Sequence, residues 1–346
     1  MFNYEKHIRG FLANKTPEKY DLKNWLLKQP LFTENDDLKK IARTYENDIN
    51  ENENEKAIRL LRAGRDLEMR RENEGKKKYG LWHLDSSNGK IELTNALYFG
   101  LWRWHVNLVP GNQEWLFNFR LGADTMNSFN TIYNTALLIM AVRMKELDKK
   151  LLDFRGSPRN SQALKIEKEY PEVVTEVYKN EALRLFASLY HTVGNFTIIP
   201  YQIKFDKNRT YEPFNRTRGT RVDICDYWDI SLQVMKNHFD REHPGLFEKY
   251  IDTFFMKELK GENGKDLSYV DESYNIVPLL ERESGHVQPQ SQPHPKTLPQ
   301  LNAYLTGVNN RILARGKQMV YTLRELFQLY SMIVVLVAIY TLTGCF

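Results

Sequence analysis

The sequence predicts a mainly α fold: a helical globular body with a few short strands, plus a C-terminal single transmembrane helix. Two observations predict this class. Several long stretches repeat apolar residues at the three- and four-residue spacing of an α-helix, and the last stretch of the chain contains no charged residue. A third observation makes a packed core feasible, because 42% of the residues are hydrophobic and 12% are aromatic.

The uncharged stretch covers residues 326–346. As a helix rising about 1.5 Å per residue it would be roughly 30 Å long, which matches the hydrocarbon core of a bilayer. Its centre, from Met332 to Ile339, is apolar on every face, whereas a surface helix would carry a polar stripe. Tyr330 and Tyr340 suit the two membrane interfaces. We therefore expect a membrane as partner, and the alternative is a buried helix or strand of the core.

Basic residues precede this stretch, and they predict which side of the membrane holds the body. They are Arg311, Arg315, Lys317 and Arg324. Basic flanks stay on the cytoplasmic side, so the N-terminal body is expected to be cytoplasmic and membrane-attached by a single pass. Cys225 and Cys345 are too far apart to indicate a disulfide framework, which favours a reducing compartment. The N-terminus lacks the apolar stretch of a secretory signal.

The chain divides into five regions by composition. Residues 1–78 are highly charged and read as helical, and residues 79–255 hold most of the aromatic side chains and form the globular body. Residues 256–300 are predicted as a linker, which is rich in Pro and Gln from 284 to 300 and so favours an extended chain. Residues 301–325 read as an amphipathic helix that leads into the anchor at 326–346.

Three helices are predicted within the body. The first runs from Ser128 to Leu151, and the second runs from Pro171 to about Tyr190, with its proline in the first turn. The third runs from Trp228 to Phe239, with Asp226 as a plausible N-cap.

The first polar motif, Gly122 to Phe129, lies just before one of these helices. Asp124, Asn127 and two neighbouring hydroxyl residues are all candidate N-caps, and four small polar residues exceed what one cap requires. Since a helix N-terminus also favours anions, a ligand contact is the alternative to capping. The second motif, His191 to Pro200, reads as a helix stop followed by a strand, in which Gly194 and Asn195 would adopt positive φ.

The third motif runs from Asn215 to Ile230. Its arginines, with the basic and aromatic residues just upstream, could hold a nucleic-acid backbone and stack bases. The same arginines could instead pair with Asp223, Asp226 and Asp229 inside the fold. The sequence contains no zinc-protease, phosphate-loop, Cys-x-x-Cys or Gly-x-Ser-x-Gly signature, so no metal site and no cofactor are assigned.

In this order, the motifs resemble an uncharacterised bacterial domain family of low-GC Gram-positive species. The resemblance covers roughly residues 79–255. It rests on Asp124 to Phe129, on His191-x-x-Gly194-Asn195-Phe196, on Asn215-x-x-Arg218-Gly219, and on Asp226-x-x-Asp229-Ile230-Ser231. It implies no activity, because none is established for that family.

The stretch from His191 to Thr197 also resembles the His-x-Leu-Gly-Asn-Leu-Thr element of HNH-type nuclease domains in modification-dependent restriction systems. Those domains carry an upstream Asp/Glu-His-Ile-x-Pro element that this sequence lacks. This resemblance therefore implies a degenerate HNH-like, metal-dependent nuclease.

The sequence thus favours a membrane-tethered binding or sensing protein for a phosphorylated or nucleotide-like ligand. Nucleic acid is the second candidate partner, and the alternatives are the degenerate nuclease and a structural scaffold without a ligand. The candidate ligand-binding residues are Asp124, Asn127, His191, Asn195, Arg216, Arg218, Asp226 and Asp229. Their carboxylates, amides and guanidiniums are groups that recognise phosphate and nucleotide functions.

Overall fold

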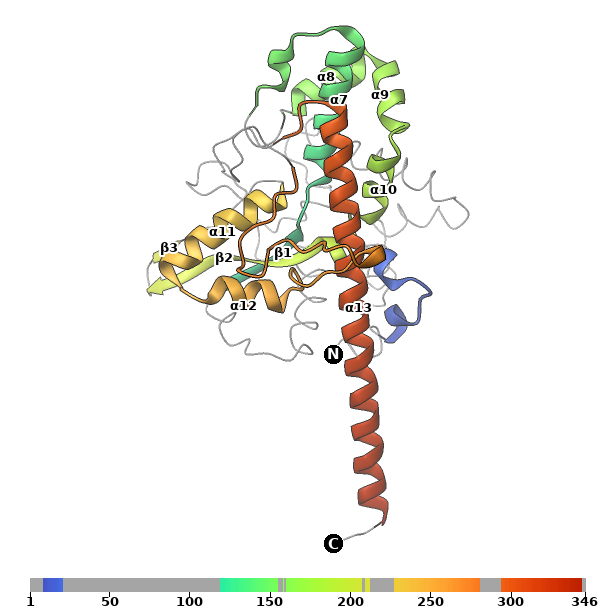
Figure 1. Cartoon of the computed structure of the whole chain (residues 1–346), viewed down its shortest axis with the longest axis vertical. Coiled ribbons are helices and arrows are strands. Elements are labelled where there is room, and N and C mark those ends of the chain that lie inside the picture. Colours follow the sequence, from blue (N-terminus) through green and yellow to red (C-terminus); the bar gives the residue numbers. More distant parts are fainter. Residues whose placement is uncertain are drawn as a thin grey trace, which may run out of the picture.

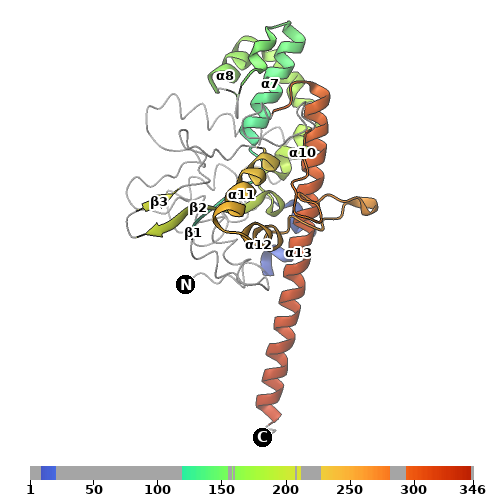
Figure 2. The same ribbon diagram turned by 60° about the vertical axis from the view of Figure 1, so that its left-hand side comes forward.

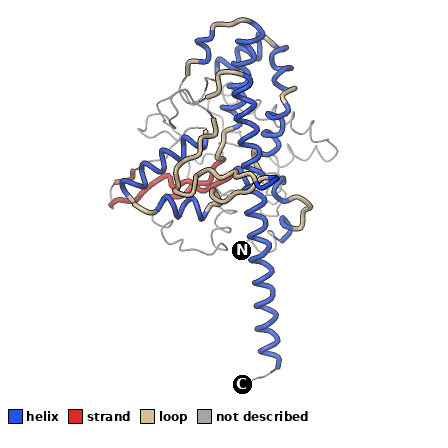
Figure 3. Tube along the Cα trace, viewed as in Figure 1, coloured by secondary structure: helices blue, strands red, loops and turns tan. Residues whose placement is uncertain are grey.

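The computed structural model describes residues 9–20, 119–154, 158, 160–206, 209–211, 227–280 and 294–343. Within these ranges the chain is mainly helical with one small sheet, as the sequence predicts. Figure 3 shows how far helix dominates the described part of the molecule. Of the predicted charged region 1–78, only residues 9–20 are described, including the short 3-10 helix η1 (Pro17–Lys19).

Helix α13 (Leu298–Thr343) is the longest element, with 46 residues and a length of about 69 Å at 1.5 Å per residue. In two views it runs along the body and then continues well beyond it (Figures 1 and 2). The predicted amphipathic helix 301–325 is confirmed as part of it. Its apolar side lies in the core through Leu301, Tyr304, Leu305, Val308, Ile312, Met319, Val320 and Leu323.

The predicted anchor occupies the projecting end of α13. In the part of the chain that the structure describes, no helix is both long and apolar enough to cross a bilayer. Side chains beyond Gln328 lie outside the described set, so the transmembrane prediction for 326–346 stays a prediction. The backbone is helical as far as Thr343, so the alternative of a buried strand does not apply to this segment.

A group of shorter helices forms the end of the body opposite to the projecting end of α13 (Figure 1). They are α7 (Phe129–Lys145), α8 (Asn160–Glu169) and α9 (Pro171–Tyr178), with the 3-10 helix η3 (Lys149–Leu152) after α7. Helix α10 (Glu181–Leu189) follows α9 and lies further down the body (Figure 1). Helix α7 packs against α8 and α9, and α10 packs along α13. The predicted helix 128–151 is therefore too long, because Glu146 takes left-handed backbone angles and ends α7.

The predicted helix from Pro171 to Tyr190 is in fact two helices, α9 and α10. Asn180 separates them by capping the second, since its Oδ1 accepts a hydrogen bond from the Leu183 amide at 3.0 Å. An asparagine can offer the backbone this local bond in place of the helical one, and this favours a new start. The break turns α10 so that Leu183, Phe186 and Leu189 are buried.

Three antiparallel strands form the sheet, in the order β1 (Phe119–Thr125), β2 (Phe196–Asp206) and β3 (Arg209–Tyr211). The first pair runs from Phe119 opposite Ile203 to Thr125 opposite Phe196. Its register shifts between Arg120 and Leu121, next to Pro200 of β2. Proline has no amide to donate to a ladder, so a bulge is a suitable place for it. The strand predicted after the second motif is confirmed as β2.

Helices α11 (Trp228–Glu242) and α12 (Leu246–Thr253) pack against each other beside the sheet. Helix α11 begins where the sequence predicts, but its N-cap is Tyr227 and not Asp226, which lies outside the described residues. The chain after α12 also differs from the prediction. Residues 256–280, which include the 3-10 helix η5 (Glu262–Gly264), were expected to be linker, yet they contribute to the core. Buried there are Met256, Leu259, Leu267, Tyr269, Val270, Leu279 and Leu280.

Candidate functional site

The first two motifs meet at the end of the β1–β2 ladder. Thr125 lies opposite Phe196, so the residues after β1 run beside η4 (Val193–Asn195), the 3-10 turn before β2. The Met126 amide donates to the Asn195 carbonyl at 2.6 Å. Two segments that are almost seventy residues apart in sequence therefore form one junction, and α13 packs against it.

Asn127 and Asn195 hold this junction together. The Asn195 Oδ1 accepts hydrogen bonds from both the amide and the Nδ2 of Asn127, each at 3.2 Å. The Asn195 Nδ2 donates to the Asn127 carbonyl at 3.3 Å and to the Tyr190 carbonyl at 2.9 Å. The Tyr304 hydroxyl, from α13, donates to the Asn127 Oδ1 at 2.9 Å. Both asparagines are fully buried, so their polar groups are used within the fold.

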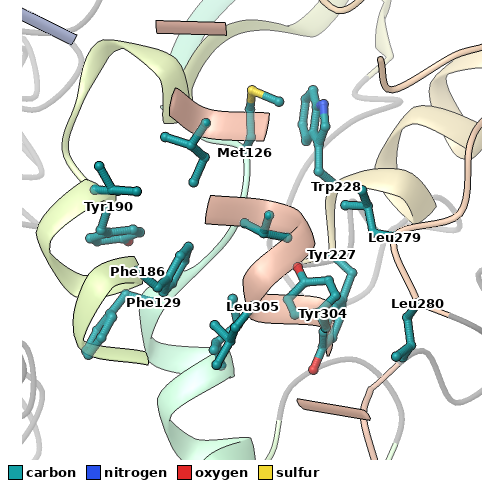
Figure 4. Close-up of a cluster of buried hydrophobic side chains, with 14 of the residues drawn as sticks. Met126, Phe129, Phe186, Tyr190, Tyr227, Trp228, Leu279, Leu280, Tyr304 and Leu305 are labelled. Atoms are coloured by element: carbon teal, nitrogen blue, oxygen red, sulfur yellow. The ribbon is translucent and has the colours of Figure 1, made fainter. Parts of the chain in front are cut away.

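Aromatic side chains surround the junction on both sides of α13. Figure 4 shows Tyr304 and Leu305 of this helix between two groups of side chains. Phe129, Phe186 and Tyr190 lie on one side, and Tyr227, Trp228, Leu279 and Leu280 lie on the other. The Tyr227 and Tyr304 rings meet edge to face, with centroids 5.3 Å apart. This packing keeps water away from the asparagine pair, which strengthens its hydrogen bonds.

Gly194 allows α13 to approach the junction closely. A Cβ built on Gly194 would overlap the carbonyl oxygen of Ile312, and it would lie 2.9 Å from the Ile312 carbonyl carbon and 3.0 Å from the Gly316 nitrogen. The prediction of positive φ at Gly194 and Asn195 is wrong, because neither residue is among the positive-φ positions of the described chain. The glycine serves backbone-to-backbone contact instead of a left-handed turn.

Arg315 of α13 is the main residue that the sequence interpretation missed. It was expected in the basic cytoplasmic flank, but its side chain is fully buried. Its Nη1 donates to the carbonyls of Gly194 and Phe196 at 2.9 and 2.6 Å and lies 3.0 Å from the Met126 sulfur. Its Nε donates to the Phe254 carbonyl at 2.7 Å. Burial lowers the pKa of Arg315 to about 10, so the guanidinium stays charged at neutral pH.

The arginine thus joins the motif junction, the end of α12 and α13 at one point. A sequence signal for its burial exists. Residues 308, 312, 315 and 319 follow helical spacing, and the other three are Val308, Ile312 and Met319 of the buried side. A charged residue within such an apolar row either is buried with the row or interrupts it. Arg315 is buried with the row.

His191 and Asp229 are also enclosed by the fold. The His191 side chain is 7% exposed, and its ring lies against Tyr190 and Phe196, with centroids 4.5 and 6.1 Å away. Asp229 is fully buried near the start of α11. Its Oδ2 accepts a hydrogen bond from the Leu279 amide at 2.8 Å, which fastens the segment 256–280 to α11. A carboxylate in the first turn also suits the positive end of the helix dipole.

The remaining candidate residues lie beyond what the structure describes in full. The backbone of Asp124 pairs with Thr197 in the sheet, but its side chain is outside the described set. Arg216, Arg218 and Asp226 lie in the undescribed stretch 212–226. The structure therefore brings Asn127 and Asn195 into contact and places the His191 ring against Tyr190 and Phe196. It places Asp229 against Leu279.

No metal centre is found among the residues with described side chains: no three His, Cys, Asp or Glu side chains there are grouped so that they could hold an ion.

Comparison with known proteins does not assign the chain to a family. No family model, curated protein or solved structure matches this chain. The resemblance of the four motifs to a bacterial domain family therefore stays a prediction from the residues alone.

Proposed function

We propose that this protein is a membrane-tethered binding or sensing module, whose body is held at a bilayer by the projecting end of α13. The observation that carries the proposal is the form of this helix. One side of its first half is buried in the core, and the helix continues without a break to Thr343, away from the body (Figure 1). No charged residue follows Glu325.

The physical argument is that an uncharged helix of this length is poorly suited to water. Residues 326–343 alone extend for about 27 Å as a helix, which is close to the thickness of the hydrocarbon layer. All of the backbone groups within such a segment bond along the helix, so the backbone needs no partner in lipid. Burial of the apolar side chains in lipid removes them from water, and this is the driving force for insertion.

Within this proposal, ligand recognition belongs to the basic and aromatic stretch that includes Arg216 and Arg218. Guanidiniums bind phosphate oxygens through paired hydrogen bonds, which suits a phosphorylated or nucleotide-like ligand. Asn127 and Asn195 would then be structural residues of the body, since their side-chain groups are occupied by each other and by Tyr304.

The closed asparagine junction also favours a second candidate function, which is a structural scaffold without a ligand. The need to fix α13 in one register is enough to explain why these polar groups are buried and bonded to one another. In that case the motifs would build a rigid holder for the helix, and the body would act only through its position at the membrane.

Cell fractionation tests the tether. The full chain is expressed, membranes are collected, and they are washed with high salt and then with alkaline carbonate. The full chain should stay in the membrane pellet, and a variant lacking residues 329–346 should move to the supernatant while Phe327 remains in place. Full-length protein that is released by salt alone would overturn the tether.

Ligand binding is tested by the melting temperature of the full chain in detergent with nucleotides, polyphosphate and short single-stranded DNA. A stabilising ligand should lose its effect in Arg218→Ala and keep part of it in Arg218→Lys. If no ligand shifts melting, the scaffold function is favoured. Cleavage of DNA or RNA with Mg²⁺ or Mn²⁺ that is lost in His191→Ala would support the degenerate nuclease instead.

A further inference from the structure

The segment 9–20 lies beside α13 at the place where this helix leaves the body (Figures 1 and 2). A Cβ added to Gly316 would lie 3.2 Å from the Glu18 Cβ, so the two backbones are close there. Further along, the Arg324 Nη2 donates to the Leu12 carbonyl at 3.1 Å. The Arg9 guanidinium lies over the Phe327 ring, 4.9 Å from its centroid. The segment therefore follows α13 from Gly316 to Phe327.

This contact is a packed one and not a loose approach. The Phe11 side chain is 1% exposed, and its ring meets that of Tyr20 edge to face. Phe327 is also buried, although it lies only one residue after the start of the uncharged stretch at Leu326. Segment 9–20 is thus fastened to the turn of α13 that contains Phe327.

The surface formed by these two stretches is basic. We call it the collar and define it as residues 9–20 together with residues 316–327 of α13. Its exposed basic residues are Arg9, Lys15, Lys19, Lys317 and Arg324. Its acidic residues are only Glu18 and Glu325. Because the basic side chains come from both stretches, the collar brings together charges that are about three hundred positions apart in sequence.

We infer that the collar binds the anionic headgroups of a phospholipid bilayer. The inference rests on the proposed tether, which would place Leu326 at the edge of the hydrocarbon layer and hence Arg9 and Arg324 at the level of the headgroups. Lys317 and Lys19 would lie roughly 10 Å further out, about one Debye length at physiological salt. Each basic residue held near an anionic surface strengthens binding by roughly fivefold.

This interaction would determine how the body stands on the membrane. A single helix leaves the body free to tilt and rotate, whereas a charged surface at its base favours one orientation. Anionic lipid would also stabilise the contact between segment 9–20 and α13, because both stretches supply charges to the same headgroups. The collar thus makes the docking of the N-terminal segment sensitive to the lipid composition of the membrane.

The test uses the full chain reconstituted into bilayers of phosphatidylcholine alone or with phosphatidylserine. Flotation measures incorporation, and amide hydrogen exchange measures the protection of residues 9–20. We expect incorporation into both bilayers. We expect exchange in segment 9–20 to be about tenfold slower in the anionic bilayer at 0.15 M salt, and the difference to disappear near 1 M salt, where the Debye length is about 3 Å.

Two double variants make the test specific. Lys15→Gln with Lys19→Gln removes two of the five exposed basic residues of the collar and should reduce the lipid effect. Lys165→Gln with Lys168→Gln removes two exposed lysines of α8, at the opposite end of the molecule, and should leave the effect unchanged. Helical circular dichroism confirms that both variants fold.

The outcomes separate the two proposals. Failure of the full chain to enter either bilayer overturns the tether and the collar together. Incorporation into both bilayers with equal protection of residues 9–20 overturns the collar and leaves the tether standing. A lipid effect that is lost equally in the collar and α8 variants also overturns the collar.

Discussion

Replacement of Gly194 by alanine tests whether the contact between η4 and α13 holds the body together. The added Cβ would overlap the Ile312 carbonyl oxygen and would lie 2.9 Å from the carbonyl carbon behind it. Real Cβ atoms essentially never come closer than 3.0 Å to another heavy atom, so one of the two backbones must move. Movement of either α13 or η4 is resisted, because Arg315 fastens the helix and Asn195 fastens the turn to the same junction.

The size of the effect follows from what resists the movement. Overpacking of a core costs roughly 1–3 kcal/mol, and it reaches the upper end when the obstacle is backbone and not the end of a flexible side chain. We therefore expect Gly194→Ala to lower the free energy of unfolding by about 3 kcal/mol. For a chain of this size, each kcal/mol corresponds to about 2–4 °C, so the melting temperature should fall by roughly 6–12 °C.

The assay is thermal and chemical unfolding of the full chain in a mild nonionic detergent, followed by helical circular dichroism. Gly307→Ala is the matched control on the same helix. Its added Cβ would meet only the flexible end of Arg311, at 3.3 Å, so the variant should be neutral or more stable by up to about 1 kcal/mol. A fall in melting temperature of about 2 °C corresponds to roughly 1 kcal/mol or less in the free energy of unfolding. If Gly194→Ala melts within about 2 °C of the wild-type chain, the close approach of α13 to Gly194 does not limit stability and the reasoning is wrong.

Three further variants test other parts of the fold. Arg315→Met leaves buried carbonyls without their donor and should cost about 3 kcal/mol in chemical unfolding, whereas Lys317→Met on the exposed side should change stability by less than about 0.5 kcal/mol. Tyr304→Phe removes the 2.9 Å bond to Asn127 and should cost about 1–2 kcal/mol; equal stability would show that this bond is dispensable. His294 is buried just before α13, with its ring stacked on Phe154. Burial lowers the pKa of His294 to about 4, so the unfolded chain binds a proton that the folded chain excludes, and stability should fall as the pH drops from about 6.5 to 4. His294→Phe should make the unfolding midpoint less dependent on pH across that window, and an unchanged slope would refute the assignment.

Helical periodicity predicted the main elements because it is a local signal. The apolar spacing located α7 and α11, and the second motif predicted a helix stop followed by a strand, which is β2. The break at Asn180 was not predicted, although its signal is also local. The apolar pattern continues across it, and only the capping side chain shows that a new helix begins.

Other features of the junction could not be predicted, because they depend on contacts between distant segments. Gly194 reads locally as a turn glycine, and the reason for its presence is the backbone of α13 more than a hundred residues later. Arg315 reads as a membrane-flanking charge, because arginine is almost never fully buried. The pairing of Asn127 with Asn195 depends on the β1–β2 register, which neither motif specifies by itself.

Residues 256–280 show a different limit of sequence interpretation. Their buried side chains, such as Leu259, Leu267 and Tyr269, follow neither a helical nor an alternating period. The segment consists mostly of turns and isolated bridges, such as Lys260 with Asp266. Without regular structure there is no regular apolar pattern, so a core segment of this kind is easily mistaken for a linker.

The long sequence separation between α13 and the segments that it contacts has a consequence for biosynthesis. Arg315 bonds to residues near position 195, and Arg324 bonds to Leu12, so residues that are synthesised far apart in time must meet. At about 5–20 residues per second, the segment 9–20 would wait roughly 15–60 s for its helix to be synthesised. During this time the aromatic side chains that α13 covers lack their contacts with it. Contacts of such long sequence separation also slow folding, so we expect the nascent chain to depend on chaperones until α13 has been synthesised.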